Sequence, residues 1–142
     1  NSCRKILNPP VSLYTLERYL LLNKYSSTPT PLGDDIIKNL NNKDHYGYTP
    51  LMKACFDENI FLVESLIKLK VDLEVRDEKY GNTALGWAAT KKKLRVTRAL
   101  LKAGANMYVK NNKGYTLYGT VMRFSSEEII KLFDEFKEKL EK

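Results

Sequence analysis

The segment Gly47-Tyr-Thr-Pro-Leu51 recurs twice further along the chain, as Gly81-Asn-Thr-Ala-Leu85 and as Gly114-Tyr-Thr-Leu-Tyr118. The three glycines are spaced by 34 and 33 residues. Each copy is preceded by an Asp or Asn, and a helix-like stretch and a block of paired aliphatic residues follow it. Self-similarity at such a period is typical of repeat proteins, so we expect one structural unit used three times.

Each repeated position has a physical reason. Glycine suits a tight turn before a helix, because it has no side chain to clash there. The threonines that follow, Thr49, Thr83 and Thr116, are placed to cap a first helix with their hydroxyl oxygens. Leu66 and Leu100 lie at matching places in the aliphatic blocks, where each would contribute about 1.5–3 kcal/mol when fully buried between successive helix pairs.

Taken together, these residues resemble the ankyrin repeat, whose family pattern runs approximately D-x-x-G-x-T-P-L-H-x-A before two antiparallel helices and a G-A-D/N turn. The resemblance covers about residues 44–136. It implies an all-α solenoid of stacked helix-turn-helix units joined by β-hairpin-like turns. Lys70 stands where the family has a turn glycine and Glu58 where it has a glycine between the helices, so we expect local backbone strain at both positions.

The residues before the first repeat are less regular. We interpret residues 1–43 as a degenerate N-terminal capping repeat, with an amphipathic helix over about 12–25 and a short helix over 34–40. The Thr-Pro pairs between these helices indicate a stiff loop, with modification of their threonines as a weaker alternative.

Residues 44–142 are expected to hold the repeats and a C-terminal capping helix, and to form one domain with the N-terminal cap. Ser125 and Glu128 have the spacing of a capping box at the start of that helix. The helix should bury one apolar stripe, formed by Ile129, Phe133, Phe136 and Leu140.

Composition limits the other possibilities. With 43% hydrophobic residues in 142, the chain can bury a core without help from disulfides or metals. Cys3 and Cys55 lack the spacing of a zinc site or of a disulfide framework. No long apolar run predicts a membrane span. We expect an intracellular protein, cytoplasmic or nuclear, with an effector secreted into a host cell as an open alternative. Because it begins at Asn1 without Met, we also expect a processed product or a piece of a longer protein.

The net charge of +7 is uneven along the chain. The segment Lys91 to Lys113 contains many Lys and Arg residues and no Asp or Glu. Such a segment can attract acidic partners, although it is more often a solubilising face.

Residues that could carry catalysis are few. The single histidine, His45, falls at an expected hairpin tip, and a dyad would require Cys55 to approach it from a helix. A lone histidine at a loop tip is more often solvated or in contact with a partner. Adjacent carboxylates are explained by helix starts and turns, and no phosphate-binding glycine motif occurs. We therefore expect no enzyme activity, no metal and no cofactor.

The resemblance also implies where a partner binds, because ankyrin repeats vary at their hairpin tips and along the inner helix, on a concave face. Carried over to this sequence, the candidate contact residues are His45, Tyr46, Tyr48, Phe56 and Asp57 in the first repeat, Lys79, Tyr80, Asn82, Thr90 and Lys91 in the second, and Asn112, Lys113, Tyr115, Arg123 and Phe124 in the third.

Two interpretations of the aromatic residues stay open. Tyrosines at the tips favour partner contact, since Tyr is enriched at interfaces, but they could instead pack against neighbouring hairpins. For Trp87 we favour packing in the core over a role in binding.

The functional hypothesis is a protein–protein interaction module, an adaptor, scaffold or targeting domain that is monomeric by itself and binds a loop or peptide of another protein. The alternative is a binder of nucleic acid or another acidic surface through Lys91 to Lys113. That alternative is weaker, because phosphate recognition would require basic and aromatic residues interleaved on one face.

Overall fold

The structure is a computed structural model that describes residues 12–24, 26–27 and 33–141. Its helices are α2 (Leu13–Lys24), α3 (Asp34–Lys38), α4 (Pro50–Phe56), α5 (Ile60–Lys68), α6 (Ala84–Thr90), α7 (Leu94–Lys102), α8 (Leu117–Phe124) and α9 (Glu127–Leu140). Cys3 and the Thr-Pro pairs at 28–31 lie outside the described residues.

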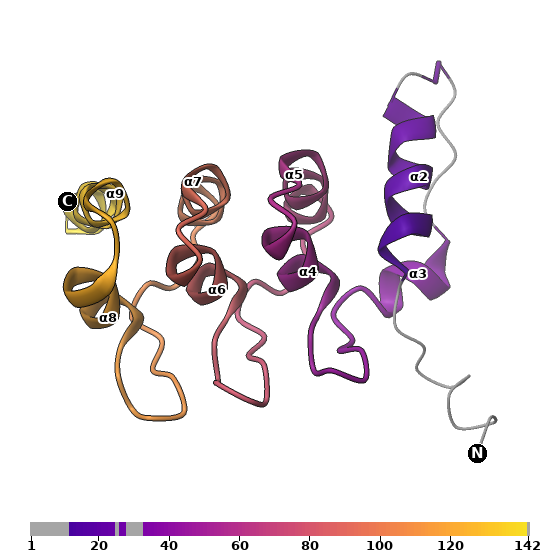
Figure 1. Cartoon of the computed structure of the whole chain (residues 1–142). Coiled ribbons are helices and arrows are strands. Elements are labelled where there is room, and N and C mark those ends of the chain that lie inside the picture. Colours follow the sequence, from indigo (N-terminus) through magenta and orange to yellow (C-terminus); the bar gives the residue numbers. More distant parts are fainter. Residues whose placement is uncertain (1–11, 25, 28–32, 142) are drawn as a thin grey trace.

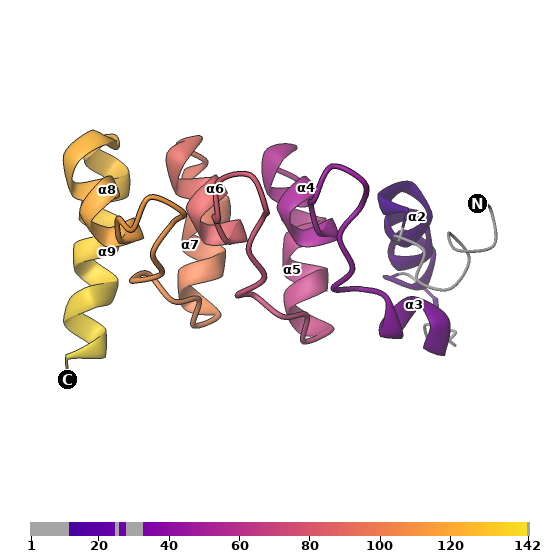
Figure 2. The ribbon, with the colours of Figure 1, turned by 90° about the horizontal axis from the view of Figure 1, so that it is seen from below.

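Three helix pairs follow one another in a row, α4 with α5, α6 with α7 and α8 with α9 (Figure 1). The inner helices α4, α6 and α8 form one layer, and the hairpin-shaped loops before them extend from the same side (Figures 1 and 2). The outer helices α5, α7 and α9 form the second layer. The expected all-α solenoid is confirmed.

The threonine caps are also confirmed. Thr49, Thr83 and Thr116 each accept a hydrogen bond on the hydroxyl oxygen from the N–H three residues further on, at 3.3, 3.3 and 3.1 Å respectively. Pro50 begins α4, where its missing N–H is no loss. A threonine therefore caps the N-terminus of each of the three inner helices.

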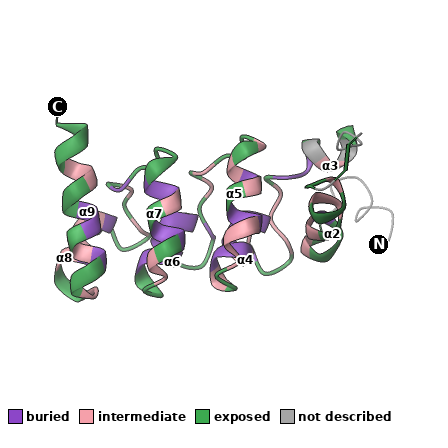
Figure 3. Ribbon diagram, turned by 90° about the horizontal axis from the view of Figure 1, so that it is seen from above, coloured by how far each residue is buried: buried purple, intermediate pink, exposed green. Residues whose placement is uncertain are grey.

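The core lies between successive helix pairs. Leu66, Leu100 and Phe133, one from each outer helix, are fully buried as expected. Figure 3 shows buried residues on the faces where neighbouring pairs meet and exposed residues along much of α9. Because each pair is buried against its neighbours, the stability of one repeat depends on the next.

The two substituted glycine positions adopt the conformation that glycine favours. Glu58 has φ of 54° and Lys70 has φ of 62°, so the expected strain sites are confirmed. Lys92, between α6 and α7, has φ of 58° in the same role, a position that the sequence reading missed.

The C-terminal helix differs from the expectation in two details. Its N-cap is Ser126, whose hydroxyl oxygen accepts a hydrogen bond from the N–H of Ile129. Ser125 is the C-cap of α8 and donates its own N–H to the carbonyl oxygen of Val121. The predicted capping box was therefore one residue too early. Leu140 is 69% exposed, not buried, because the 14-residue α9 continues past the 9-residue α7 against which it packs.

The N-terminal helix α2 packs against α4 and buries Leu16 completely. It runs across the direction of the paired helices instead of joining them (Figure 1). Its interpretation as a degenerate repeat stays a prediction. Within the described ranges, no helix has the length and apolar character needed to cross a membrane.

Candidate binding groove

The three hairpin tips, residues 44–48, 77–82 and 111–115, are each held by the side chain of their first residue. Asp44 accepts hydrogen bonds on Oδ1 from the N–H groups of Tyr46 and Tyr48, both at 3.0 Å. Asp77 in the second tip and Asn111 in the third accept the equivalent pairs of N–H groups. Tight side-chain-to-backbone turns of this kind fix the direction in which the tip residues point.

An ion pair also stabilises the first tip. Lys53 of α4 places its Nζ 3.1 Å from Oδ2 of Asp44. Burial raises the pKa of Asp44, but the hydrogen bonds from Tyr48, Lys53 and Tyr46 outweigh it and leave that pKa below its usual value. The carboxylate is therefore ionised at neutral pH.

The tips project tyrosines into solvent. Tyr46 is 72% exposed, Tyr80 47% and Tyr115 62%. His45, also exposed, lies against Tyr46 with ring centroids 3.9 Å apart. These exposed rings are available to contact another molecule.

A second set of aromatic side chains forms a cluster where the first and second repeats meet. Trp87 on α6 packs edge to face with Tyr48, Phe56 and Tyr80, at centroid distances of 5.9, 5.0 and 5.5 Å. The expected burial of Trp87 is thus confirmed, and Tyr48 is partly buried against rings of the inner helices α4 and α6. The indole Nε1 is buried without a hydrogen-bond acceptor among the described residues.

Three adjoining depressions run along the face formed by the tips and the inner helices. The first, of about 570 Å³, lies over the aromatic cluster; the second, of about 230 Å³, lies between the second and third tips; the third, of about 440 Å³, lies over α8. The first and second share Tyr80 and Thr90, and the second and third share Tyr115 and Thr120. Because neighbouring depressions share walls, we treat them as one groove.

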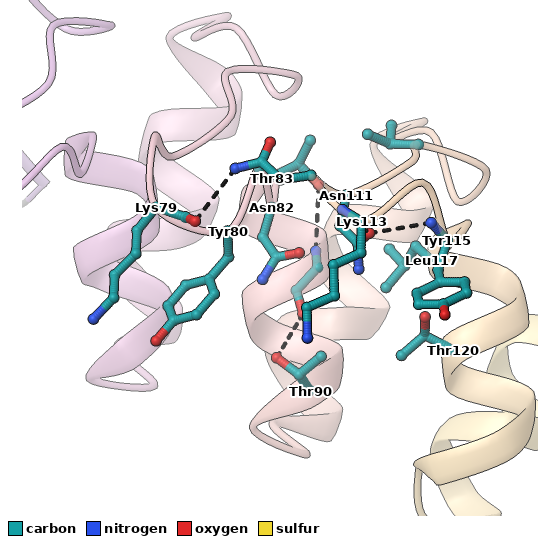
Figure 4. Close-up of a pocket in the computed structure, with 14 residues that line it drawn as sticks. Lys79, Tyr80, Asn82, Thr83, Thr90, Asn111, Lys113, Tyr115, Leu117 and Thr120 are labelled. Carbon is teal, nitrogen blue, oxygen red and sulfur yellow. Dashed lines mark hydrogen bonds between the residues drawn. The ribbon is translucent and has the colours of Figure 1, made fainter.

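Figure 4 shows the middle of this groove, where Lys79, Tyr80 and Lys113 extend in the same direction from the second and third tips. The hydroxyl of Thr90 at the end of α6 donates to the carbonyl oxygen of Gly86 at 2.8 Å. The hydrogen of this hydroxyl is therefore already used within its own helix.

The second and third tips are fastened to each other. Asn112 donates from its side chain to the carbonyl oxygens of Glu78 and Lys79, at 3.1 and 3.2 Å. Arg76 donates to the carbonyl oxygens of Gly81 and Lys110, at 2.9 and 2.6 Å. The side-chain NH2 group of Asn112 therefore helps to fix the groove wall, and its predicted contact with a partner stays a prediction.

Of the predicted contact residues, the groove brings together the following, from all three repeats: Tyr48, Phe56, Lys79, Tyr80, Asn82, Thr90, Lys91, Asn112, Lys113, Tyr115, Arg123 and Phe124. His45, Tyr46 and Asp57 are exposed but do not line it. Sequence reasoning missed Thr120, which lines two depressions; its position one helical turn after the capping Thr116 was the available signal.

The possible dyad has no support in the geometry. Cys55 is buried in α4, and burial raises the pKa of its thiol to about 12, whereas His45 is exposed at the tip. A thiol with so high a pKa is a poor nucleophile. The described residues also contain no group of His, Cys, Asp or Glu side chains suited to a metal ion.

A helical solenoid with a continuous groove along its tips and inner helices defines the chain as a repeat protein of the binding class. The chain belongs to the ankyrin-repeat family: the family description, ankyrin repeats in three copies, matches residues 18–111. The matched segment begins within α2, earlier than the resemblance noted in the sequence. Ankyrin repeats are generally protein–protein interaction modules and are typically not enzymes.

Known proteins agree with this assignment. The chain is 34% identical over 84 residues to ankyrin repeat and SAM domain-containing protein 6 of Mus musculus, covering 59% of this chain and 9% of that protein. It is 36% identical over 74 residues to dauer abnormal formation protein 25 of Caenorhabditis elegans, covering 52% and 19%. This chain thus spans a small part of the length of either relative.

Among solved structures, the ankyrin repeat domain of Bcl-3, a member of the IkappaB protein family, superposes with a TM-score of 0.62 at 21% identity, over 70% of this chain and 43% of that one. At this identity the likeness concerns the fold.

Proposed function

We propose that this chain is a protein–protein interaction module that binds a loop or peptide segment of a partner in the groove. The observation that carries the proposal is the continuity of the three depressions across all three repeats. A groove of this kind suits an extended chain better than a compact small molecule, because it runs across three repeats and its walls repeat.

The groove also has the chemistry of a protein interface. Tyr80, Tyr115 and Phe124 are exposed along it, and stiff aromatic side chains supply large contact area with little loss of conformational entropy. The hydrogen bonds of Asn112 and Arg76 hold the tips in place before binding, which lowers the entropy lost when a partner docks. Because the curated relatives are much longer, we further propose that the module acts as the adaptor, scaffold or targeting part of a larger protein.

The alternative, binding of nucleic acid through Lys91 to Lys113, is less well supported. Lys91 and Lys113 line the groove, but Lys93 pairs with Glu58 at 3.8 Å. Further basic residues of this segment are exposed along the outer helix α7, among them Arg95, Arg98 and Lys102. The segment is thus divided between two faces and forms no single basic track.

Photo-crosslinking tests the proposal. A photoreactive phenylalanine analogue replaces Tyr115 in the groove, and in a matched variant it replaces Arg98 on α7. We expect a partner protein to be crosslinked from position 115 and not from position 98. The double variant Tyr115→Ala, Phe124→Ala should lose the partner while its circular dichroism spectrum and urea unfolding stay close to those of the native chain, because both side chains are mostly exposed.

Two outcomes contradict the proposal. Crosslinking from position 98 alone would place the interface on the outer helices. Loss of the captured material on nuclease treatment, with a steep fall in binding as salt rises, would favour the nucleic-acid alternative.

A further inference from the structure

The charged side chains of the groove are all of one sign. They are Lys79, Lys91, Lys113 and Arg123. No Asp or Glu of the described residues lines any of the three depressions. The groove therefore carries a positive field with no carboxylate of its own to neutralise it locally.

Two cations close to the groove, by contrast, are paired with carboxylates. Lys53 pairs with Asp44 at 3.1 Å and Lys93 with Glu58 at 3.8 Å. The groove cations form no such ion pair with a carboxylate of the described residues. Lys79 instead makes a cation–π contact, with its Nζ 5.2 Å from the centroid of the Tyr80 ring.

The cations occupy two edges of the groove. Lys79 and Lys113 belong to the second and third tips, and Lys91 and Arg123 belong to the C-terminal ends of α6 and α8. The exposed rings of Tyr80 and Tyr115 line the same groove. The equivalent end of α4 carries an acidic residue, the exposed Asp57, so the positive character is confined to the second and third repeats.

We infer that the groove accepts an extended acidic peptide segment of a partner protein, with its carboxylates beside the cations of the second and third repeats and an apolar residue over the aromatic cluster. This inference rests on the proposed function and specifies the chemistry of the partner. Inner helices packed about 8–10 Å apart span about 20 Å over three repeats, which corresponds to about six residues of extended chain.

A single-stranded nucleic acid is the competing polyanion. It would place a phosphate beside every base, including the part of the groove lined by Tyr48 and Phe56 of the first repeat, which contributes no cation. A peptide can place its carboxylates over two repeats and an apolar side chain over the third. The charge pattern therefore favours the peptide.

The test selects ligands from a random library of twelve-residue peptides displayed on phage, with the native chain as the target at 0.15 M salt. At this ionic strength charges far from the groove are largely screened. Two variants with equal loss of charge are compared with the native chain. The groove variant carries Lys79→Gln, Lys91→Gln and Lys113→Gln; the control variant carries Arg95→Gln, Arg98→Gln and Lys102→Gln on α7.

We expect the native chain and the control variant to enrich peptides with several Asp or Glu residues, and the groove variant to lose that acidic preference. Enriched peptides of neutral or basic composition that require Tyr80 and Tyr115 would overturn this inference and leave the proposed function intact. If no enriched peptide depends on groove residues, the proposed function fails as well.

Trp87 supplies a direct affinity measurement, because it is the single tryptophan of the chain and lies under the groove. Titration of an enriched acidic peptide should change its fluorescence, with a Kd about tenfold weaker for the groove variant and within about threefold for the control, as exposed ion pairs permit. Lys79→Glu with Lys113→Glu should reverse the preference toward basic peptides. Tighter binding of a twelve-nucleotide oligothymidylate than of the peptide would overturn the inference.

Discussion

Tyr48 and Trp87 meet edge to face across the boundary between the first and second repeats, with ring centroids 5.9 Å apart. Tyr48 comes from a hairpin tip and Trp87 from an inner helix, so the contact links the loop layer to the helix layer. Phe56 packs against both rings. This cluster forms the floor of the groove at one end and part of the core at the same time.

The cluster predicts different effects for two neighbouring tyrosines. Tyr48→Ala should lower the free energy of unfolding by about 1–3 kcal/mol, because it removes packing against Trp87 and Phe56. Tyr46→Ala should change it by less than about 0.5 kcal/mol, because Tyr46 is 72% exposed. Urea unfolding followed by circular dichroism measures both. Equal losses in the two variants would contradict the packing described here.

Gly81 is predicted to tolerate a side chain less well than Gly104. Both have positive φ, 74° and 91°, so alanine strains the backbone by about 1–2 kcal/mol at either position. Only at Gly81 would the new Cβ also lie 2.8 Å from Nη2 of Arg76 and from Cγ of Asn112, whereas nothing lies near it at Gly104. Gly81→Ala should therefore unfold at lower urea than Gly104→Ala, and it should also weaken binding in the groove.

The glycine that the first repeat lacks should stabilise it if restored. Lys70 lies two residues after the end of α5, in the left-handed region with φ of 62°, and Gly104 has the matching place after α7. We expect Lys70→Gly to raise the free energy of unfolding by about 0.5–1 kcal/mol, since relief of strain exceeds the added freedom of the unfolded chain. Gly104→Lys should act in the opposite direction. Thermal and urea unfolding of both variants checks that the two substitutions change the free energy of unfolding in opposite directions.

Asp44 is predicted to make stability depend on pH in the acid range. Although burial raises its pKa, the hydrogen bonds from Tyr48, Lys53 and Tyr46 leave the folded value below the usual 3.8. The stabilisation is therefore fully present above about pH 4, and it disappears as the pH falls from 3.8 through the lower folded pKa.

The variant Asp44→Asn isolates this contribution, because its amide oxygen can still accept the two backbone N–H groups. We expect the native chain to be more stable than the variant at pH 7 and the difference to shrink below pH 3.8. Urea unfolding between pH 7 and 2 gives the difference at each pH. A stability difference between the native chain and the variant that stays constant over that range would show that the carboxylate charge does not stabilise the first tip.

Much of this organisation could be predicted from the sequence because its causes are local. A threonine before a helix caps it whatever lies nearby, and a glycine or its substitute marks a left-handed turn, so the three units, their caps and the strain at Glu58 and Lys70 were predictable. The prediction of a capping box at Ser125 was wrong by one residue, because two adjacent serines offer equivalent hydroxyls. Only the position at which α8 ends makes Ser126 the N-cap of α9.

The sequence by itself determined the repeat, its period and the residues placed at each hairpin tip, since these follow from spacing along the chain. Only the tertiary structure decided which aromatic residues enter the core, that Asn112 fastens one tip to another, and that basic residues distant in sequence share one groove. Those relationships depend on how closely successive repeats stack, and the stacking distance is set by side-chain packing between helices.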